Sequence, residues 1–264
     1  MSDADHGQVN TAAAEIYESF FLPALFSQWP ARLLNAVGVE RGDRVLDVGT
    51  GTGVAARAAA ERVGPSGDVQ AIDPNAGMLA VARRSPLAIG WVSGGAEALP
   101  FDPGRFDRVI SQFALMFFAD RAASIAEMAR VLRPGGTVAI AVWASLEMTP
   151  GYAAMVDLLD RLFGRAAAGA LSAPYSMGDA DALAELVGRS FKNVRVDLHP
   201  GEARFDSIDD WVYTDIRGWT LADAITDEEF EQLRAEAAIE LARFTDAAGH
   251  VSFAAPALIA TGIR

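Results

Sequence analysis

The sequence of 264 residues has no cysteine and only one lysine. Without cysteine, the chain cannot form disulfides, thiolate nucleophiles or cysteine-ligated zinc sites, and this composition fits a reducing compartment. The single lysine, Lys192, lies in a segment that resembles neither a P-loop nor a Schiff-base site. These absences exclude phosphate binding by a P-loop lysine and covalent catalysis by cysteine.

Positive charge is also scarce, because 22 Lys and Arg residues face 35 Asp and Glu residues, which gives a net charge of −13. No basic cluster offsets this charge, and an acidic chain repels nucleic-acid phosphates and anionic lipid. Residues 1–5 lack a signal-peptide pattern, and no apolar run reaches the roughly 18 residues of a membrane span. We expect a cytoplasmic protein that binds neither nucleic acid nor membrane; its oligomeric state is left open.

What the sequence does contain is enough apolar material for a full core, at 51% of residues, and we expect one domain over residues 1–264. Between residues 44 and 143, short β-type runs alternate with helical patterns, which predicts an α/β fold with a parallel sheet. The predicted strands are 44–48, 68–73, 89–92, 106–111 and 136–143, and the predicted helices are 53–63, 75–84 and 119–132.

The flanking segments are largely helical. Residues 11–38 are rich in aromatics, and they either cap a pocket or pack on the sheet. After Trp143, helices are predicted at 149–163 and 179–189, and strands at 192–198 and 256–263. Residues 206–248 are predicted to be a helical lid insertion with Trp211, Tyr213 and Trp219, in which Thr226 and Glu229 form a capping box for a helix that runs to about Thr245.

The segment Asp47–Gly53 follows an apolar strand and precedes a good helix former, with glycine at every second position. Such a turn brings free backbone N–H groups close to a ligand at a helix start, which indicates a nucleotide pocket. The spacing is G-x-G-x-G rather than the G-x-G-x-x-G of dinucleotide folds. Asp47 would repel a pyrophosphate and attract an amino group.

Asp73 ends the second predicted strand, at the sheet edge where a carboxylate can accept the two hydroxyls of a ribose. Because Pro74 follows, Asp73 can also be the N-cap of the next helix, and the two roles can coexist.

Three further segments complete the pattern: residues 96–101 after the third strand, 106–111 in the fourth, and 127–136 leading into the fifth. Together with the glycine turn and Asp73, they resemble the class I S-adenosylmethionine-dependent methyltransferases, in particular the branch that acts on small molecules. The resemblance spans residues 40–145, includes similar N-terminal helices at 11–38, and is loose over the last hundred residues. It implies a Rossmann-like seven-stranded sheet of order 3-2-1-4-5-7-6, with the last strand antiparallel.

The resemblance also implies roles for the cofactor-binding residues. Asp47 and the backbone of Gly49 and Gly51 would hold the methionine part, and Asp73 the ribose. Pro74 and the backbone of Ala96 would contact adenine, and the Ser111 carbonyl would face the methionine amino group. The full predicted set of contacts to S-adenosyl-L-methionine is Asp47, Gly49, Thr50, Gly51, Asp73, Pro74, Ala96, Glu97, Ser111, Gln112 and Tyr17.

One position departs from the family pattern. Members often have an acidic residue before the Ala96-Glu97 pair, and this chain has Gly95. Either Glu97 or a water replaces that contact to the adenine amino group, or the cofactor binds more weakly. The Ser111-Gln112-Phe113-Ala114 sequence also lacks the Asn/Asp-Pro-Pro-aromatic turn of members that methylate nucleic-acid amines.

The apolar run 113–118 after the fourth strand suggests a small apolar or aromatic methyl acceptor. Methyl transfer from a sulfonium is a direct displacement that mainly needs alignment, so a general base is optional. His6, His199 and His250 follow no pattern, and we assign no catalytic residue. Two alternatives stay open: an NAD(P)-dependent oxidoreductase, and a regulatory module that binds S-adenosylmethionine without turnover.

Overall fold

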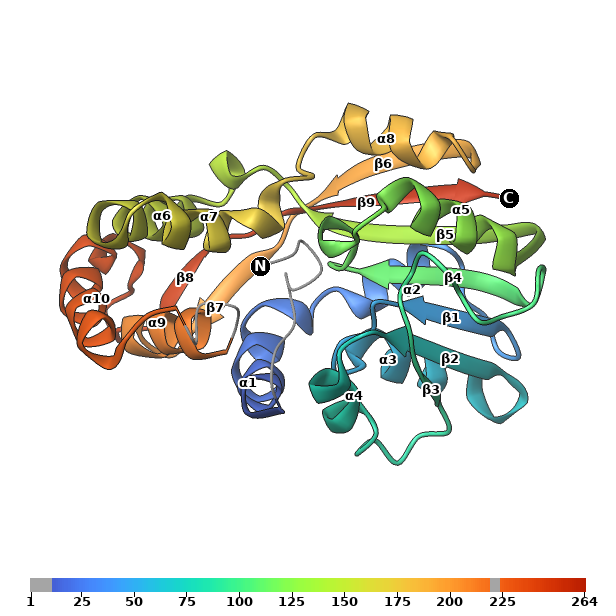
Figure 1. Cartoon of the computed structure of the whole chain (residues 1–264), viewed down its shortest axis with the longest axis horizontal. Coiled ribbons are helices and arrows are strands. Elements are labelled where there is room, and N and C mark those ends of the chain that lie inside the picture. Colours follow the sequence, from blue (N-terminus) through green and yellow to red (C-terminus); the bar gives the residue numbers. More distant parts are fainter. Residues whose placement is uncertain (1–10, 219–223) are drawn as a thin grey trace.

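The computed structural model describes residues 11–218 and 224–264, and its centre is a seven-stranded sheet (Figure 1). The order is β3-β2-β1-β4-β5-β9-β6, and β9 runs antiparallel to both of its neighbours. Since β9 is the seventh strand of this sheet in chain order, the predicted order and the antiparallel last strand are both confirmed. The strands are β1 (Arg44–Val48), β2 (Asp68–Asp73), β3 (Gly90–Ser93), β4 (Phe106–Gln112), β5 (Leu132–Trp143), β6 (Lys192–His199) and β9 (Ala257–Ile263).

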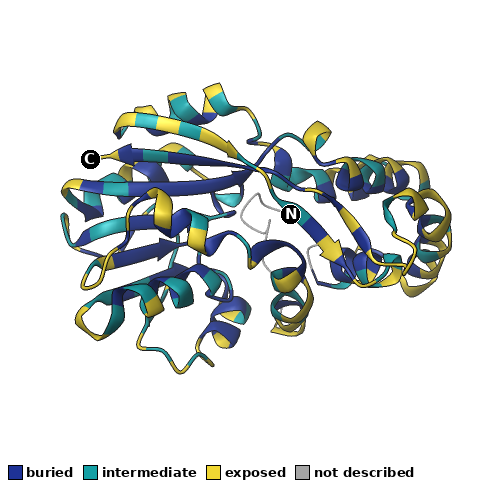
Figure 2. Ribbon diagram, turned by 180° about the vertical axis from the view of Figure 1, so that it is seen from behind, coloured by how far each residue is buried: buried dark blue, intermediate teal, exposed yellow. Residues whose placement is uncertain are grey.

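Helices cover both faces of this sheet, as the alternating pattern predicted. One face carries α2 (Pro30–Ala36) and α3 (Val54–Val63), which contact each other, and the other carries α5 (Arg121–Val131) and α8 (Ala180–Gly188) (Figure 1). Because both faces of the sheet are covered, the central strands are buried over most of their length: β1 from Val45 to Val48 and β5 from Val138 to Trp143 (Figure 2). The edge strand β6 alternates between exposed and partly buried residues.

A helical lobe extends from the sheet on the side where the strands β1, β4 and β5 end (Figure 1). A two-stranded sheet of β7 (Glu202–Phe205) and β8 (Val251–Ala254) joins it to the rest of the chain. Trp211, Phe205 and Phe253 form an aromatic core inside it. The helices of this lobe are α6 (Pro150–Phe163), α7 (Arg165–Ser172), α9 (Ile208–Arg217) and α10 (Asp227–Glu240).

The segment 206–248 lies between β7 and β8 and contains α9 and α10. The capping box is present as predicted, with the Thr226 side chain accepting from the Glu229 N–H and the Glu229 side chain accepting from the Thr226 N–H. The helix ends at Glu240, earlier than predicted, and a short 3-10 turn follows at Ala242–Phe244. Trp219 and His6 fall outside the described residues.

The N-terminal segment is helical, with α1 (Thr11–Ile16) followed by a wider π-helix, η2 (Tyr17–Phe26). Pro23 lies inside η2 and has no N–H to donate, and the helix ends with a bond from the Ser27 N–H to the Leu22 carbonyl, five residues back. In this segment, α1 contacts α4 (Ala76–Ala82), the helix that follows β2. The aromatic segment therefore lies beside the carboxyl end of β2.

Candidate cofactor site

The glycine turn joins β1 to α3, and its three glycines have positive φ angles of 71° at Gly49, 55° at Gly51 and 91° at Gly53. A Cβ at Gly49 would lie 2.3 Å from Cβ of Ala114, and one at Gly53 would lie 2.5 Å from the Trp91 ring. A Cβ at Gly51 would meet no atom within 4 Å. The outer two glycines thus permit close packing, while the Cα of the middle one faces open space.

Asp47 is the buried acid at the start of this turn, with 1% of its surface exposed. Its Oδ2 accepts a 2.6 Å hydrogen bond from the Thr50 hydroxyl, and its Oδ1 is buried with no partner. Burial raises the pKa of Asp47 to about 7, and the negative charge of Asp73 adds to this shift. Buried polar atoms are almost always paired, so an unpaired carboxylate oxygen here suits a donor supplied by a ligand.

Asp73 supports the turn from the end of β2. It accepts 2.8 Å hydrogen bonds from the N–H groups of Gly51 and Asn75, one on each oxygen. The N-cap of α4 is Asn75, whose side chain accepts from the Met78 N–H, so the prediction that Asp73 is also the N-cap is wrong. Burial raises the pKa of Asp73. Each carboxylate oxygen keeps a second lone pair, which leaves room for ribose hydroxyls.

The end of β4 lies directly beside the turn, where the Ser111 hydroxyl donates to the Val48 carbonyl over 2.8 Å. Oε1 of Gln112 is buried without a partner. The next residue, Phe113, has a φ of 54°, a strained value for a bulky side chain, and its ring stacks on Trp143 at 3.9 Å. The backbone strain and the ring stacking at Phe113 thus fix the end of β4, directly after Gln112.

The predicted adenine contacts come from two loops. Ala96 is buried in the loop after β3, and Pro74 is exposed at the end of β2. The Glu97 carboxylate accepts from the N–H groups of Ala119 and Asp120, at 3.0 and 3.4 Å. A Cβ at Gly95 would lie 2.8 Å from Oε2 of Glu97, a contact that a small shift of the flexible Glu97 side chain would relieve.

The N-terminal segment reaches this site through two residues of η2. Tyr17 is partly buried, and burial together with the negative charges of Glu18 and Asp73 raises its pKa. Glu18 forms a 2.8 Å ion pair with Arg57, which also donates to the Thr52 carbonyl at 2.6 Å. No local pattern indicated Glu18 or Arg57 in advance, because 39 residues separate these partners.

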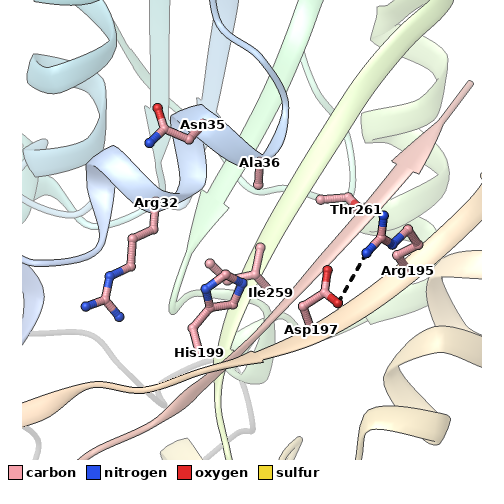
Figure 3. Close-up of a pocket in the computed structure, with 8 residues that line it drawn as sticks. All are labelled: Arg32, Asn35, Ala36, Arg195, Asp197, His199, Ile259 and Thr261. Atoms are coloured by element: carbon pink, nitrogen blue, oxygen red, sulfur yellow. Dashed lines mark ion pairs between the residues drawn. The ribbon is translucent and has the colours of Figure 1, made fainter.

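Neither of the two histidines in the described residues lies at the glycine turn. His250 lies on the exposed surface, 3.5 Å from Asp246. His199 lines a different cavity, of about 410 Å³, between α2 and the strands β6 and β9 (Figure 3). Arg32 from α2 and Arg195 from β6 line the same cavity. The described part of the chain thus offers no histidine base beside Asp47 and Asp73.

Comparisons with known proteins agree with this geometry. A family model described as a methyltransferase domain matches residues 45–136, which contain the turn, Asp73 and the end of β4. The ubiquinone/menaquinone biosynthesis C-methyltransferase UbiE of Bordetella parapertussis is 35% identical over 144 residues, covering 52% of this chain and 56% of that protein. The demethylmenaquinone methyltransferase of Beutenbergia cavernae is 36% identical over 129 residues, covering 47% and 52%. The chain thus spans about half the length of these relatives.

Solved structures show the same fold over more of the chain. A candidate methyltransferase from an antibiotic biosynthesis pathway of Anabaena variabilis has a TM-score of 0.66 at 17% identity, covering 88% of this chain and 96% of that chain. A phosphoethanolamine N-methyltransferase of Haemonchus contortus, in complex with S-adenosyl-L-methionine, has a TM-score of 0.62 at 19% identity, covering 99% and 60%. The family match over residues 45–136, the identities to the relatives and the sheet topology make this chain similar to the class I S-adenosylmethionine-dependent methyltransferases.

Proposed function

We propose that this protein binds S-adenosylmethionine at the glycine turn and transfers its methyl group to a small aromatic or apolar acceptor. The observation that carries the proposal is the unpartnered Oδ1 of Asp47, a buried anionic oxygen beside a backbone that is open at Gly51. Oε1 of Gln112, on the neighbouring strand, is buried and unpartnered as well. An ammonium group has the donors and the charge to satisfy such oxygens.

Each residue of the site has its own proposed contact with the cofactor. Asp47 takes the methionine ammonium, Gly51 lets the backbone approach, and Asp73 accepts the ribose hydroxyls. Ala96 and Pro74 contact the adenine, and the partly buried Tyr17 covers the site from the N-terminal segment. When bound, S-adenosylmethionine supplies an activated methyl group on a sulfonium, so the protein's task is to align the acceptor and to exclude water.

The acceptor is inferred from the side chains around the end of β4. Phe113, Trp143 and Tyr175 form a run of aromatic contacts there, with ring centroids 3.9 and 6.3 Å apart. The relatives that match about half of the chain are named a ubiquinone/menaquinone biosynthesis C-methyltransferase and a demethylmenaquinone methyltransferase. Both facts support an aromatic ring of the quinol type as the acceptor.

Two segments would enclose the site: residues 11–38 as an N-terminal cap and residues 206–248 as a lid. The cap is fixed to the cofactor half by the Glu18–Arg57 ion pair and by a 2.6 Å pair between Glu15 and Arg84. In contrast, α9 and α10 contact α6, η2 and α1 rather than the central sheet. Hence we expect the lid to move more readily than the cap when an acceptor enters.

The experiment is a transfer assay with S-adenosylmethionine carrying a labelled methyl group. Naphthohydroquinone and catechol serve as aromatic acceptors, and glycine and phosphoethanolamine as polar ones. We expect label in the product of at least one aromatic acceptor and in neither polar one. Label only in the polar products would overturn the proposed acceptor class.

A further inference from the structure

Strand β6 is the last strand in the order of the central sheet, so within the described residues β9 pairs with one of its edges and the other edge is open (Figure 1). At such an edge, the backbone N–H and C=O groups of alternate residues lack a strand partner. A bulge lies at the beginning of β6, where the register with β9 shifts between Lys192 and Arg195 and Asn193 has a φ of 52°. Beyond this bulge, β6 continues as a regular strand to His199.

The two faces of β6 carry different side chains. Arg195 and Asp197 lie on the face toward α2, where they line the cavity described above (Figure 3). Their ion pair is loose, at 3.6 Å, and the side chains are 75% and 54% exposed. Since side chains alternate along a strand, Val194, Val196 and Leu198 lie on the other face. Leu198 is 51% exposed, so this edge leaves apolar surface in water.

The charges of β6 select one register for a second copy of the chain. When two identical strands pair antiparallel about a two-fold axis, opposed side chains point to the same face, so the axis lies at one residue. An axis at Arg195 or Asp197 opposes that residue to its own copy, which places like charges together. An axis at Val194 extends the pairing into the bulge, and one at Leu198 extends it to Pro200, which has no N–H to donate.

We propose that β6 is a homodimer interface, in which two copies of the chain pair antiparallel about a two-fold axis at Val196 and continue the central sheet. In this register, Arg195 of each copy lies directly opposite Asp197 of the other, at the Cβ separation of about 4.5–5.5 Å that is usual for opposed residues. On the other face, Val194 lies opposite Leu198 and covers its exposed apolar surface. Charges of opposite sign thus face each other across the axis, and the open backbone groups gain partners.

The first test is the mass of the full chain in solution, measured by sedimentation velocity. Because the contact between two short strands is small, we expect a weak dimer, and a range of about 1–100 μM brackets it. The mass should rise with concentration from 27.9 kDa toward twice that value.

Charge reversals test the register. Arg195→Asp and Asp197→Arg each oppose like charges, so each variant alone should lose at least about tenfold in dimer affinity. A mixture of the two should form a heterodimer, because the acidic edge of one then faces the basic edge of the other. The double variant Arg195→Asp/Asp197→Arg should dimerise like the wild type. The matched control is Arg83→Asp, an exposed arginine beside α4 near the opposite edge of the sheet, which should keep the wild-type dimer.

Since the chain has no cysteine, introduced thiols can locate the axis. In Val196→Cys the two thiols face each other, with Cα atoms about 4.5–5.5 Å apart, and mild oxidation should link the copies by a disulfide. In Leu198→Cys each thiol lies opposite position 194 of the other copy, roughly 14 Å from its counterpart. This variant should not link, although Leu198 is the more exposed of the two positions.

A wild type that stays monomeric at the highest concentration would overturn the proposal, as would a dimer that survives both charge reversals. Single variants that do not combine on mixing, or linkage at position 198 in place of 196, would overturn the register and the proposal with it. Circular dichroism on heating checks that each variant is folded. None of these measurements involves S-adenosylmethionine, so their outcome is separate from that of the proposed function.

Discussion

At the scale of single residues, the proposed cofactor site contains two buried carboxylates with different surroundings. Asp73 has a backbone N–H on each oxygen, so the protein alone nearly satisfies it. Asp47 has one hydroxyl partner and one oxygen without any. We therefore propose that Asp73 binds the neutral ribose diol, whose hydroxyls add donors to a carboxylate that already has hydrogen bonds on both oxygens. We propose that Asp47 binds the ammonium cation, which gives its unpaired oxygen a donor.

The ribose assignment predicts the effect of Asp73→Ala. Loss of hydrogen bonds to a charged acceptor should weaken binding of S-adenosylhomocysteine by about ten- to a hundredfold, which corresponds to about 1.5–3 kcal/mol. Calorimetry measures this change. The matched control is Asp68→Ala, at the opposite end of the same strand and paired with Arg105, and it should leave the affinity within about twofold. An unchanged affinity in Asp73→Ala would remove Asp73 from the site.

The ammonium assignment predicts a pH dependence. Because the pKa of Asp47 is raised to about 7, its carboxyl is largely protonated at pH 5 and must lose that proton to pair with an ammonium. Affinity for S-adenosylhomocysteine should therefore rise between pH 5 and 7, by up to about tenfold per pH unit, and level off above. The proton released on binding is measured by calorimetry in buffers of different ionisation enthalpy.

The controls for this pH dependence are one ligand and one variant. 5′-Methylthioadenosine lacks the amino-acid part and should bind without the rise, and Asp47→Asn should bind S-adenosylhomocysteine without it. The same rise with 5′-methylthioadenosine would show that Asp47 does not bind the ammonium.

At the scale of elements, the glycine turn combines a structural and a ligand-facing role. Gly53 has a positive φ and faces the Trp91 ring, while Gly51 has a positive φ and faces open space. The same substitution should thus have different consequences at two positions only two residues apart.

We expect Gly53→Ala to destabilise the fold by about 2–5 kcal/mol, because left-handed strain adds to a collision with Trp91. Gly51→Ala should cost only the strain, about 1–2 kcal/mol, yet weaken S-adenosylhomocysteine binding at least about tenfold by blocking the backbone. Urea unfolding and calorimetry measure the two effects. Equal loss of stability in both variants, with binding intact in Gly51→Ala, would contradict the assigned roles.

Elements with strong local signals could be predicted from the sequence. The strands of the central sheet alternate with glycine-punctuated helices, and the capping box at Thr226 and Glu229 is a local pattern. Other elements lack such signals. The strands β7 and β8 are four residues each, no helix was predicted at 165–172, and the bounds of α9 within the predicted helical insertion 206–248 were not given. Strand β5 begins at Leu132, four residues before the predicted start at residue 136. Leu132 already pairs with Phe106 of β4, and the regular pairing of the two strands resumes at Thr137.

Site residues could be predicted from the sequence only where they lie at the end of a strand or in the turn that follows it. Asp47, Gly51 and Asp73 follow such local signals. The partners Glu18 and Arg57 are 39 residues apart, and Tyr152 and Asp215 are 63 apart. No spacing rule connects side chains at these separations, so tertiary packing alone brings them together.

At the scale of the whole molecule, the match to the methyltransferase family model ends before the helical lobe, whereas solved structures of the same fold cover most of the chain. The family model covers residues 45–136, while α6, α7, α9 and α10 lie outside it. Within the described residues no helix is both long and apolar enough to cross a membrane. The residues proposed to bind the cofactor thus lie mostly inside the matched segment, and the helices of the lobe lie outside it.

The most direct test of the central claim is calorimetry of the wild type with S-adenosylhomocysteine and with NAD under the same conditions. The turn with Asp47 predicts saturable, one-to-one binding of S-adenosylhomocysteine and no binding of NAD, whose pyrophosphate the Asp47 carboxylate would repel. Binding of NAD without binding of S-adenosylhomocysteine would contradict the account.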